Sequence, residues 1–209
     1  MRMCINTLLL MALNFGHKAQ TMVTSFGEGK TYKITIISKK GKMADYKKLI
    51  PIILKWEGGY AGNIDGMICT MKGVTLAAYK QYFGKQKTCN DLKNISNQEW
   101  ETIFKTGYWD RWKADEINNQ AIANLLVDWT WGSGVWGIKY PQAVLGVTVD
   151  GKVGPKTLAA INNHPDQKKL FKLLWERRKK HFEDIAKRDK AKAKFLKGWL
   201  NRLSDFKYI

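Results

Sequence analysis

Apolar residues recur at helical spacing in the stretch that leads to a pair of adjacent glycines. Ile50, Ile53 and Leu54 occupy positions i, i+3 and i+4, and Glu57 takes the next position on the same face. The glycines at 58–59 stop a helix, because glycine readily adopts the left-handed backbone that closes the last turn. The pattern therefore predicts a helix that ends at Glu57, with a half-buried carboxylate beside a loop.

The rest of the chain is also mostly helical in its pattern. Ser96 and Glu99 form a capping box, which marks a helix start. Similar signals predict helices over residues 75–83, 96–106, 118–131, 166–187 and 191–203. The alternating run at 32–37 predicts a single strand, residues 132–137 are interpreted as a glycine-rich joint, and 149–153 as a tight turn or small hairpin. Most of the nine tryptophans, Trp109 and Trp112 first among them, are expected in the core.

Glu57 could act as a general acid, and two further groups that could serve the same reaction follow it. Burial and the negative end of a helix dipole both favour a protonated carboxyl, which suits a general acid. Asp65 and Thr70 follow on a segment with the turn-forming residues Gly62, Asn63 and Gly66. In a glycosidase, one acid protonates the leaving oxygen while a second carboxylate holds a water. The alternative is that Glu57 is an ordinary helix-end residue that faces solvent.

Three blocks of the chain carry a family resemblance. The first is Glu57-Gly58-Gly59-Tyr60 with Asn63, Asp65, Thr70 and residues 73–75, and it is similar to the N-terminal signature of glycoside hydrolase family 108. Residues 108–112 with 114–116 resemble the same family. The third block, within 145–160, resembles its C-terminal peptidoglycan-binding-type segment. The chain departs from the family pattern at Met67, Ile68 and Met71, which affects the shape of the loop after Glu57.

The resemblance implies a mainly α, lysozyme-like α+β fold: a helical bundle around a cleft, with a small β-hairpin or loop after the catalytic helix. It also implies an N-acetylmuramidase that cuts the β-1,4 bond between N-acetylmuramic acid and N-acetylglucosamine. Glu57 would be the general acid, and Asp65 with Thr70 would position the water, giving inversion. The residues expected to bind substrate are Tyr60, Asn63, Thr75 and Asp128. For Asp128 the alternative is a bond to a neighbouring helix end.

The net charge of the chain limits the kinds of partner that it is expected to bind. The chain has 36 Lys and Arg against 18 acids, a formal net charge of +18, and residues 168–209 carry 15 of the basic residues and 5 of the acids. Such an excess indicates a polyanionic partner, here peptidoglycan strands, since no nucleic-acid-reading motif is present.

No His, Cys and carboxylate cluster has metal-ligand spacing, so neither metal nor cofactor is expected. Among Cys4, Cys69 and Cys89, the last two could pair if the chain is exported.

The expected domains are an N-terminal extension over 1–42, a catalytic segment over 43–131 and a helical peptidoglycan-binding-type segment over 132–209. The extension is either a short signal peptide, whose apolar run is too short to span a membrane, or a misassigned start preceding Met43. We expect a monomer that acts at the bacterial wall after export or phage-type release. The alternative functions are a lytic transglycosylase, a non-catalytic peptidoglycan-binding protein and, from charge alone, a nucleic-acid binder.

Overall fold

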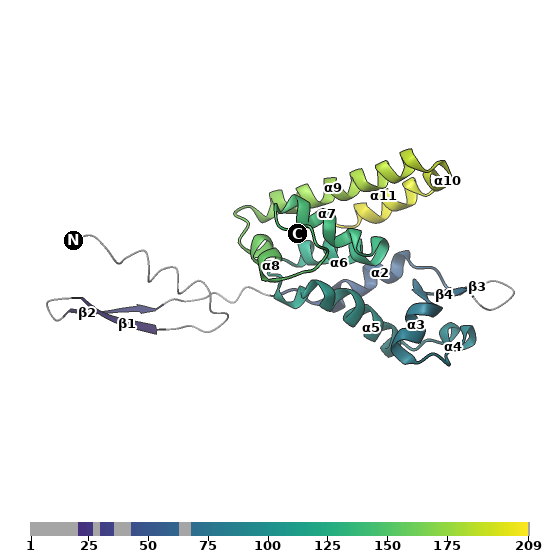
Figure 1. The fold of residues 1–209 in the computed structure, drawn as a ribbon, viewed down its shortest axis with the longest axis horizontal. Helices are drawn as coiled ribbons and strands as arrows, with labels where there is room; N and C mark the ends of the chain where they lie inside the picture. The colour runs from purple at the N-terminus through teal and green to yellow at the C-terminus, as the bar shows by residue number, and fades with distance from the viewer. Residues whose placement is uncertain (1–20, 27–29, 36–42, 63–67, 209) are drawn as a thin grey trace. The chain divides into compact units, whose positions relative to one another are not determined.

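The computed structural model describes residues 21–26, 30–35, 43–62 and 68–208, and it divides into two units, 1–42 and 43–209. In the first unit, β1 (Thr21–Phe26) and β2 (Lys30–Thr35) pair antiparallel, with Thr21 opposite Thr35 (Figure 1). The single strand predicted at 32–37 is therefore wrong in its start and in lacking a partner. Residues 36–37 and the signal-peptide prediction lie outside the described residues.

The second unit is mainly helical, which confirms the predicted fold class (Figure 1). A small antiparallel sheet follows its first long helix. In chain order its elements are η1 (Tyr46–Lys48), α2 (Ile50–Trp56), β3 (Ala61–Gly62), β4 (Cys69–Met71), β5 (Val74–Thr75), α3 (Leu76–Phe83), α4 (Cys89–Lys93), α5 (Asn97–Phe104), η2 (Lys105–Trp109), η3 (Asp110–Trp112), η4 (Ala114–Glu116), α6 (Gln120–Ser133), α7 (Trp136–Val144), α8 (Pro155–Asn162), α9 (Gln167–Arg188), α10 (Lys190–Ala193) and α11 (Leu196–Ser204).

Local sequence signals account for most helix starts. Ser96 and Glu99 form the predicted capping box at α5, and Thr88 with Asp91 forms a second one at α4. Pro51 lies in the first turn of α2, where a missing backbone donor costs nothing. The predicted helices correspond to α3, α5, α6 and α9 with small shifts at their ends. The tail helix predicted at 191–203 is wrong in being continuous, because the two helices α10 and α11 replace it.

One helix was missed altogether. Residues 132–137 were interpreted as a joint, but α7 begins at Trp136 and packs against α6. The reason lies at Gly137, where an added Cβ would come within 2.5 Å of the Thr130 Cα. This glycine permits close approach of two helices rather than breaking one. The turn predicted at 149–153 has no strand, and the buried Gln142 side chain bonds to Asp150 and Gly151 there.

A disulfide fixes the small sheet to the helices that follow it. The strand order is β3-β4-β5, with Thr70 opposite both Ala61 and Thr75. Cys69 of β4 is bonded to Cys89 of α4, 20 residues along the chain, so the pairing left open by the sequence is formed. The sheet therefore cannot separate from α4.

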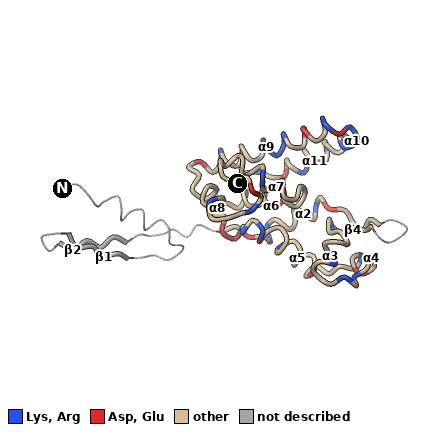
Figure 2. Tube along the Cα trace, in the orientation of Figure 1, with Lys and Arg blue, Asp and Glu red and all other residues tan. Residues whose placement is uncertain are grey.

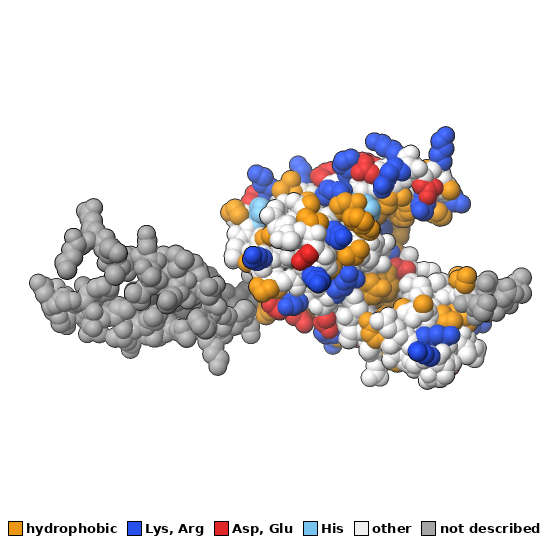
Figure 3. Space-filling model, in the orientation of Figure 1, with side chains coloured by type: hydrophobic (Ala, Val, Ile, Leu, Met, Phe, Trp, Pro, Cys, Tyr) orange, Lys and Arg blue, Asp and Glu red, His pale blue; other side chains and the backbone are white. Residues whose placement is uncertain are grey.

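The core of the second unit is centred on α6, which packs against α7 and α9. Trp109 and Trp112 are fully buried, as expected, and so is Trp129. Lys and Arg residues are frequent along α9, α10 and α11 (Figure 2). The surface is hollowed between those three helices and the part formed by α3, α4 and the small sheet (Figure 3). No helix of the described residues is long and apolar enough to cross a membrane.

Candidate active site

Glu57 is the residue at which α2 ends. Its backbone N–H still donates to the Ile53 carbonyl, at 3.2 Å, but its φ and ψ of −90° and 133° are those of extended chain. Ile53 is buried, whereas Leu54 is 36% exposed, so the inward face runs through Leu49 and Ile53 rather than through Leu54. The Glu57 side chain is 15% exposed. The predicted half-buried carboxylate at a helix end is therefore present.

Two donors hold one oxygen of the Glu57 carboxylate. Oε1 accepts from the indole Nε1 of Trp131, at 2.7 Å, and from Nη1 of Arg202, also at 2.7 Å. An indole N–H and a guanidinium therefore fix the orientation of this carboxylate from one side. Trp131 in turn packs against Trp100, Phe104 and Tyr108, with ring centroids 5.8, 5.8 and 4.6 Å away.

The turn between β4 and β5 lies against the other oxygen. Gly73 has a φ of +77°, and a Cβ added to it would lie 2.5 Å from Glu57 Oε2 and 2.7 Å from the Trp131 ring. Both the backbone conformation and the space therefore require glycine. Lys72 precedes it at a φ of +48°, and the Lys72 N–H donates to the Gly58 carbonyl at 3.2 Å. These contacts fix the turn against the loop that carries Glu57.

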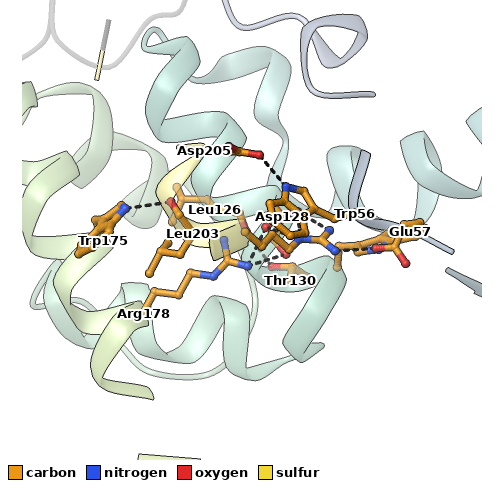
Figure 4. Close-up of polar contacts among 11 residues, drawn as sticks. Trp56, Glu57, Leu126, Asp128, Thr130, Trp175, Arg178, Leu203 and Asp205 are labelled. Carbon is orange, nitrogen blue, oxygen red and sulfur yellow. Dashed lines mark hydrogen bonds and ion pairs between the residues drawn. The ribbon is translucent and has the colours of Figure 1, made fainter. Parts of the chain in front are cut away.

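Behind Glu57 lies a buried chain of charges. Asp128 of α6 is fully buried, and its Oδ2 accepts from Nη2 of Arg178 at 2.7 Å. Its Oδ1 accepts from Nη2 and Nε of Arg202, at 2.6 and 3.1 Å. Asp128 lies between Arg178 and Glu57 (Figure 4). Arg202 therefore bridges the two carboxylates, and its side chain is 16% exposed.

The substrate-binding role expected for Asp128 is corrected by this environment. A side chain with no exposed surface does not contact a sugar, and arginines occupy both of its oxygens. The alternative prediction, a bond to a neighbouring helix end, is closer to what the structure shows, although the partners are side chains within α9 and near the end of α11. Burial lowers the pKa of Arg178, and Asp128 opposes that effect. Burial also acts to lower the pKa of Arg202, but Asp128 and Glu57 outweigh it and raise the pKa above its ordinary value.

The other predicted residues lie on the loop and sheet after Glu57. Asn63 and Asp65 lie outside the described residues. Thr70 is in β4 and partly exposed, while the Thr75 hydroxyl caps α3 by accepting from the Ala78 N–H at 3.2 Å. Tyr60 is 39% exposed, and the Lys93 Nζ lies 5.6 Å from its ring centroid. Within the described chain, the hydrogen-bond donors to the Glu57 side chain are Trp131 and Arg202 rather than any of these.

Sequence reasoning missed three residues that surround the Glu57 carboxylate: Gly73, Trp131 and Arg202. Gly73 belongs to the first block of the family resemblance, but its role depends on a turn whose backbone could not be derived from spacing. Arg202 lies in a basic tail that is expected to be solvated, and its one sequence signal is its place beside Leu203 on the inward side of the last helix. The described residues include no cluster of His, Cys, Asp and Glu that could hold a metal ion.

Comparison with known families decides what these residues belong to. Residues 50–134 match the model described as "Glycosyl hydrolase 108". The predicted resemblance to this family is confirmed. Residues 136–204, which follow the glycosyl hydrolase 108 segment, match the model described as "Predicted Peptidoglycan domain". Among solved structures, the chain is similar to one titled "Structure of Brucella abortus SagA", with 25% identity, a TM-score of 0.65, and coverage of 77% of this chain and 90% of that one. A search of curated proteins found no match.

The buried charged residues come from both family segments. Glu57, Asp128 and Trp131 belong to the glycosyl hydrolase 108 segment, whereas Arg178 and Arg202 belong to the peptidoglycan domain. The two family matches together support a peptidoglycan hydrolase of the glycosidase class. A domain boundary between 131 and 132 stays a prediction, and helix α6 runs across it.

Proposed function

We propose that the protein is an N-acetylmuramidase that hydrolyses the β-1,4 bond between N-acetylmuramic acid and N-acetylglucosamine, with Glu57 as general acid. One observation carries the proposal: a partly exposed carboxylate ends a helix, is oriented by two donors and is backed by a glycine turn. Fixed orientation of an acid against the bond that it protonates is the main contribution such a group needs from its surroundings.

In the proposed reaction, Glu57 gives its proton to the glycosidic oxygen as the bond from that oxygen to the muramic acid C1 breaks. A water attacks C1 from the opposite face and passes its proton to Asp65, with Thr70 helping to orient it. The products are a free reducing muramic end and a new 4-hydroxyl on glucosamine. This is an inverting mechanism, for which the two carboxyls should lie roughly 6.5 to 9.5 Å apart when the sugar is bound.

Tyr60, Asn63 and Thr75 are proposed to bind the glycan beside the acid. An aromatic ring such as that of Tyr60 offers an apolar face to a sugar ring, and its exposure leaves that face available. The excess of Lys and Arg along α9 to α11 would add attraction for a wall polymer that bears carboxylates. Nothing in this proposal requires a metal or cofactor.

Replacing Glu57 with Gln tests the proposal on purified peptidoglycan. The amide keeps the size of the side chain but removes the transferable proton, so release of soluble fragments should fall by on the order of 10² to 10⁴. Glu116→Gln is the matched control, since Glu116 is an exposed carboxylate of the same segment. An undiminished rate in Glu57→Gln would overturn the assignment of the acid.

Mass spectrometry of the products separates the remaining alternatives. A reducing muramic end means hydrolysis, whereas a 1,6-anhydro product means a lytic transglycosylase that needs no water-activating Asp65. Asp65→Asn should then cost as much as Glu57→Gln in the hydrolase and little in the transglycosylase. Binding to peptidoglycan with no soluble product would instead identify a non-catalytic binding protein.

A further inference from the structure

Arg202 reaches the candidate catalytic acid from the other family segment. It lies 145 residues beyond Glu57, near the end of α11, and its Nη1 donates to Glu57 Oε1 at 2.7 Å. The same helix face is also joined to the end of α2 through Asp205, whose Oδ2 accepts from Trp56 Nε1 at 2.7 Å (Figure 4). The same oxygen accepts from Lys55 Nζ, also at 2.7 Å. Arg202 and Asp205 are three residues apart and therefore point the same way.

The partners of Oε1 decide which oxygen can carry a proton. An indole N–H and a guanidinium are donors only, so a hydroxyl on Oε1 would face two groups that cannot accept from it. The proton of neutral Glu57 must therefore be on Oε2. Gly73 lies beside Oε2, and its lack of a side chain leaves space there, because an added Cβ would come within 2.5 Å of that oxygen. Oε2 is thus the oxygen from which a proton can leave.

The orientation of Arg202 is itself fixed. Its Nη2 and Nε bond to Asp128, and its Nη1 is left for Glu57. Asp128 is held in turn by the buried Arg178, at 2.7 Å. A guanidinium has its donors in one rigid plane, so binding Asp128 with one edge aims the remaining donor at Glu57. A lysine ammonium could not bind Asp128 with one edge and aim a fixed donor at Glu57.

We propose that Arg202, from the peptidoglycan domain, is a positioning residue of the active site that fixes Glu57 Oε1 and so assigns the transferable proton to Oε2. The inference rests on the proposed function, in which Glu57 is the acid. It means that the active site is complete only when both family segments are present, and that the peptidoglycan domain contributes to the chemical step as well as to attachment.

The positive charge of Arg202 gives the proposal a pH readout. Among the residues that the structure describes, the charged or titratable groups near Glu57 include Arg202 on α11, Asp128 behind it on α6, and Tyr108 on η2, whose pKa is raised mainly by burial. Of these, Arg202 alone is a cation in contact with the carboxylate. Removing this cation changes the electrostatics of the active site, so the pH dependence of kcat should change with it.

The experiment compares Arg202→Gln, Arg202→Lys and Asp205→Asn in the full chain, with kcat and KM measured on soluble glycan fragments across pH. Arg202→Gln should lower kcat by about 10- to 100-fold while KM changes by less than about threefold, the loss expected for a misplaced reacting group. Its pH–rate profile should differ from that of wild type. Arg202→Lys keeps the charge, so its pH–rate profile should stay near that of wild type, with kcat only partly recovered.

Asp205→Asn is the matched control, because it weakens the same contact between α11 and α2 without touching Glu57. It should leave kcat and the pH profile unchanged. Near-ultraviolet circular dichroism checks that each variant is folded. A folded Arg202→Gln variant with wild-type kcat would overturn the inference, and so would equal losses in Arg202→Gln and Asp205→Asn. Glu57→Gln separates the two proposals: if it stays active, the proposed function fails, whereas an inactive Glu57→Gln with a normal Arg202→Gln sinks only this inference.

Discussion

Asp128→Asn is the change for which the structure predicts the largest loss of stability. Asp128 is the shared anion of two guanidiniums, one of which, Arg178, has a side chain only 2% exposed. Nε and Nη1 of Arg178 are buried without a hydrogen-bond partner, and its Nη2 donates to Asp128, so Asp128 is the anion that pairs with this buried guanidinium in the described structure. An asparagine is neutral and would also turn an N–H₂ group towards one of two donor-only partners.

The size of the effect follows from this arrangement. Removing one partner of a buried ion pair costs about 3 to 5 kcal/mol, because the remaining charge is left buried and uncompensated. For a domain of this length, each kcal/mol lowers the midpoint of thermal unfolding by about 2 to 4 °C, which gives a fall of about 6 to 20 °C. Arg178→Met should cost less, since it removes a buried charge while Asp128 keeps Arg202 as its partner.

Urea unfolding followed by tryptophan fluorescence measures both variants. Asp184→Asn serves as the control, because Asp184 pairs with Lys180 on an exposed face of α9 and its loss should leave the unfolding midpoint nearly unchanged. The reasoning is refuted if Asp128→Asn unfolds within about 1 kcal/mol of wild type, or if Arg178→Met is the less stable of the two. Either result would mean that Asp128 does not neutralise Arg178 in solution.

Three further predictions concern stability and the extent of the active unit. Cys89→Ser should lower the free energy of unfolding by about 3 kcal/mol, the value expected for opening a disulfide loop of this length, and reducing agent should then have no further effect. Burial, aided by Arg177, lowers the pKa of His181 to about 4, so the unfolded chain binds the proton first as pH falls from about 6.5 to 4. Stability is lost over that window, and urea midpoints of His181→Gln should depend less on pH there. A chain that starts at Met43 should fold and digest peptidoglycan at the full-length rate, because 43–209 is a unit with its own core; loss of folding would contradict this.

Local sequence signals were enough to predict the helix that ends at Glu57, because helical spacing and a glycine stop act over a few residues. The capping box at Ser96 was found for the same reason. Trp131 and Arg202 could not be assigned to the site in this way, since they reach Glu57 across 74 and 145 residues through packing that no local pattern encodes. For Asp128 the sequence predicts either substrate binding or a bond to a neighbouring helix end, and local patterns do not choose between them because its partners come from two later helices.

Gly137 illustrates the opposite error. Glycines at 132, 134 and 137 together favour a loop by local propensity, yet here Gly137 lets α7 pack on the backbone of α6. Tertiary contact overrides the local preference, and the helix was missed. The assignment of Asp65 as the residue that holds the water stays a prediction, because Asp65 lies outside the described residues.

The helical register of α11 has a consequence for how such chains can vary in length. Each residue advances a helix by about 100°, so one insertion or deletion between Phe195 and Arg202 would turn the guanidinium away from Glu57 while leaving the composition of the helix intact. Insertions or deletions among the exposed residues of the preceding α10 would instead change the length of the chain before α11 begins. In related chains, we therefore expect gaps in alignments to collect before α11 and to be absent within it. A chimaera that receives a foreign peptidoglycan domain would have to be joined in phase to keep its acid aligned.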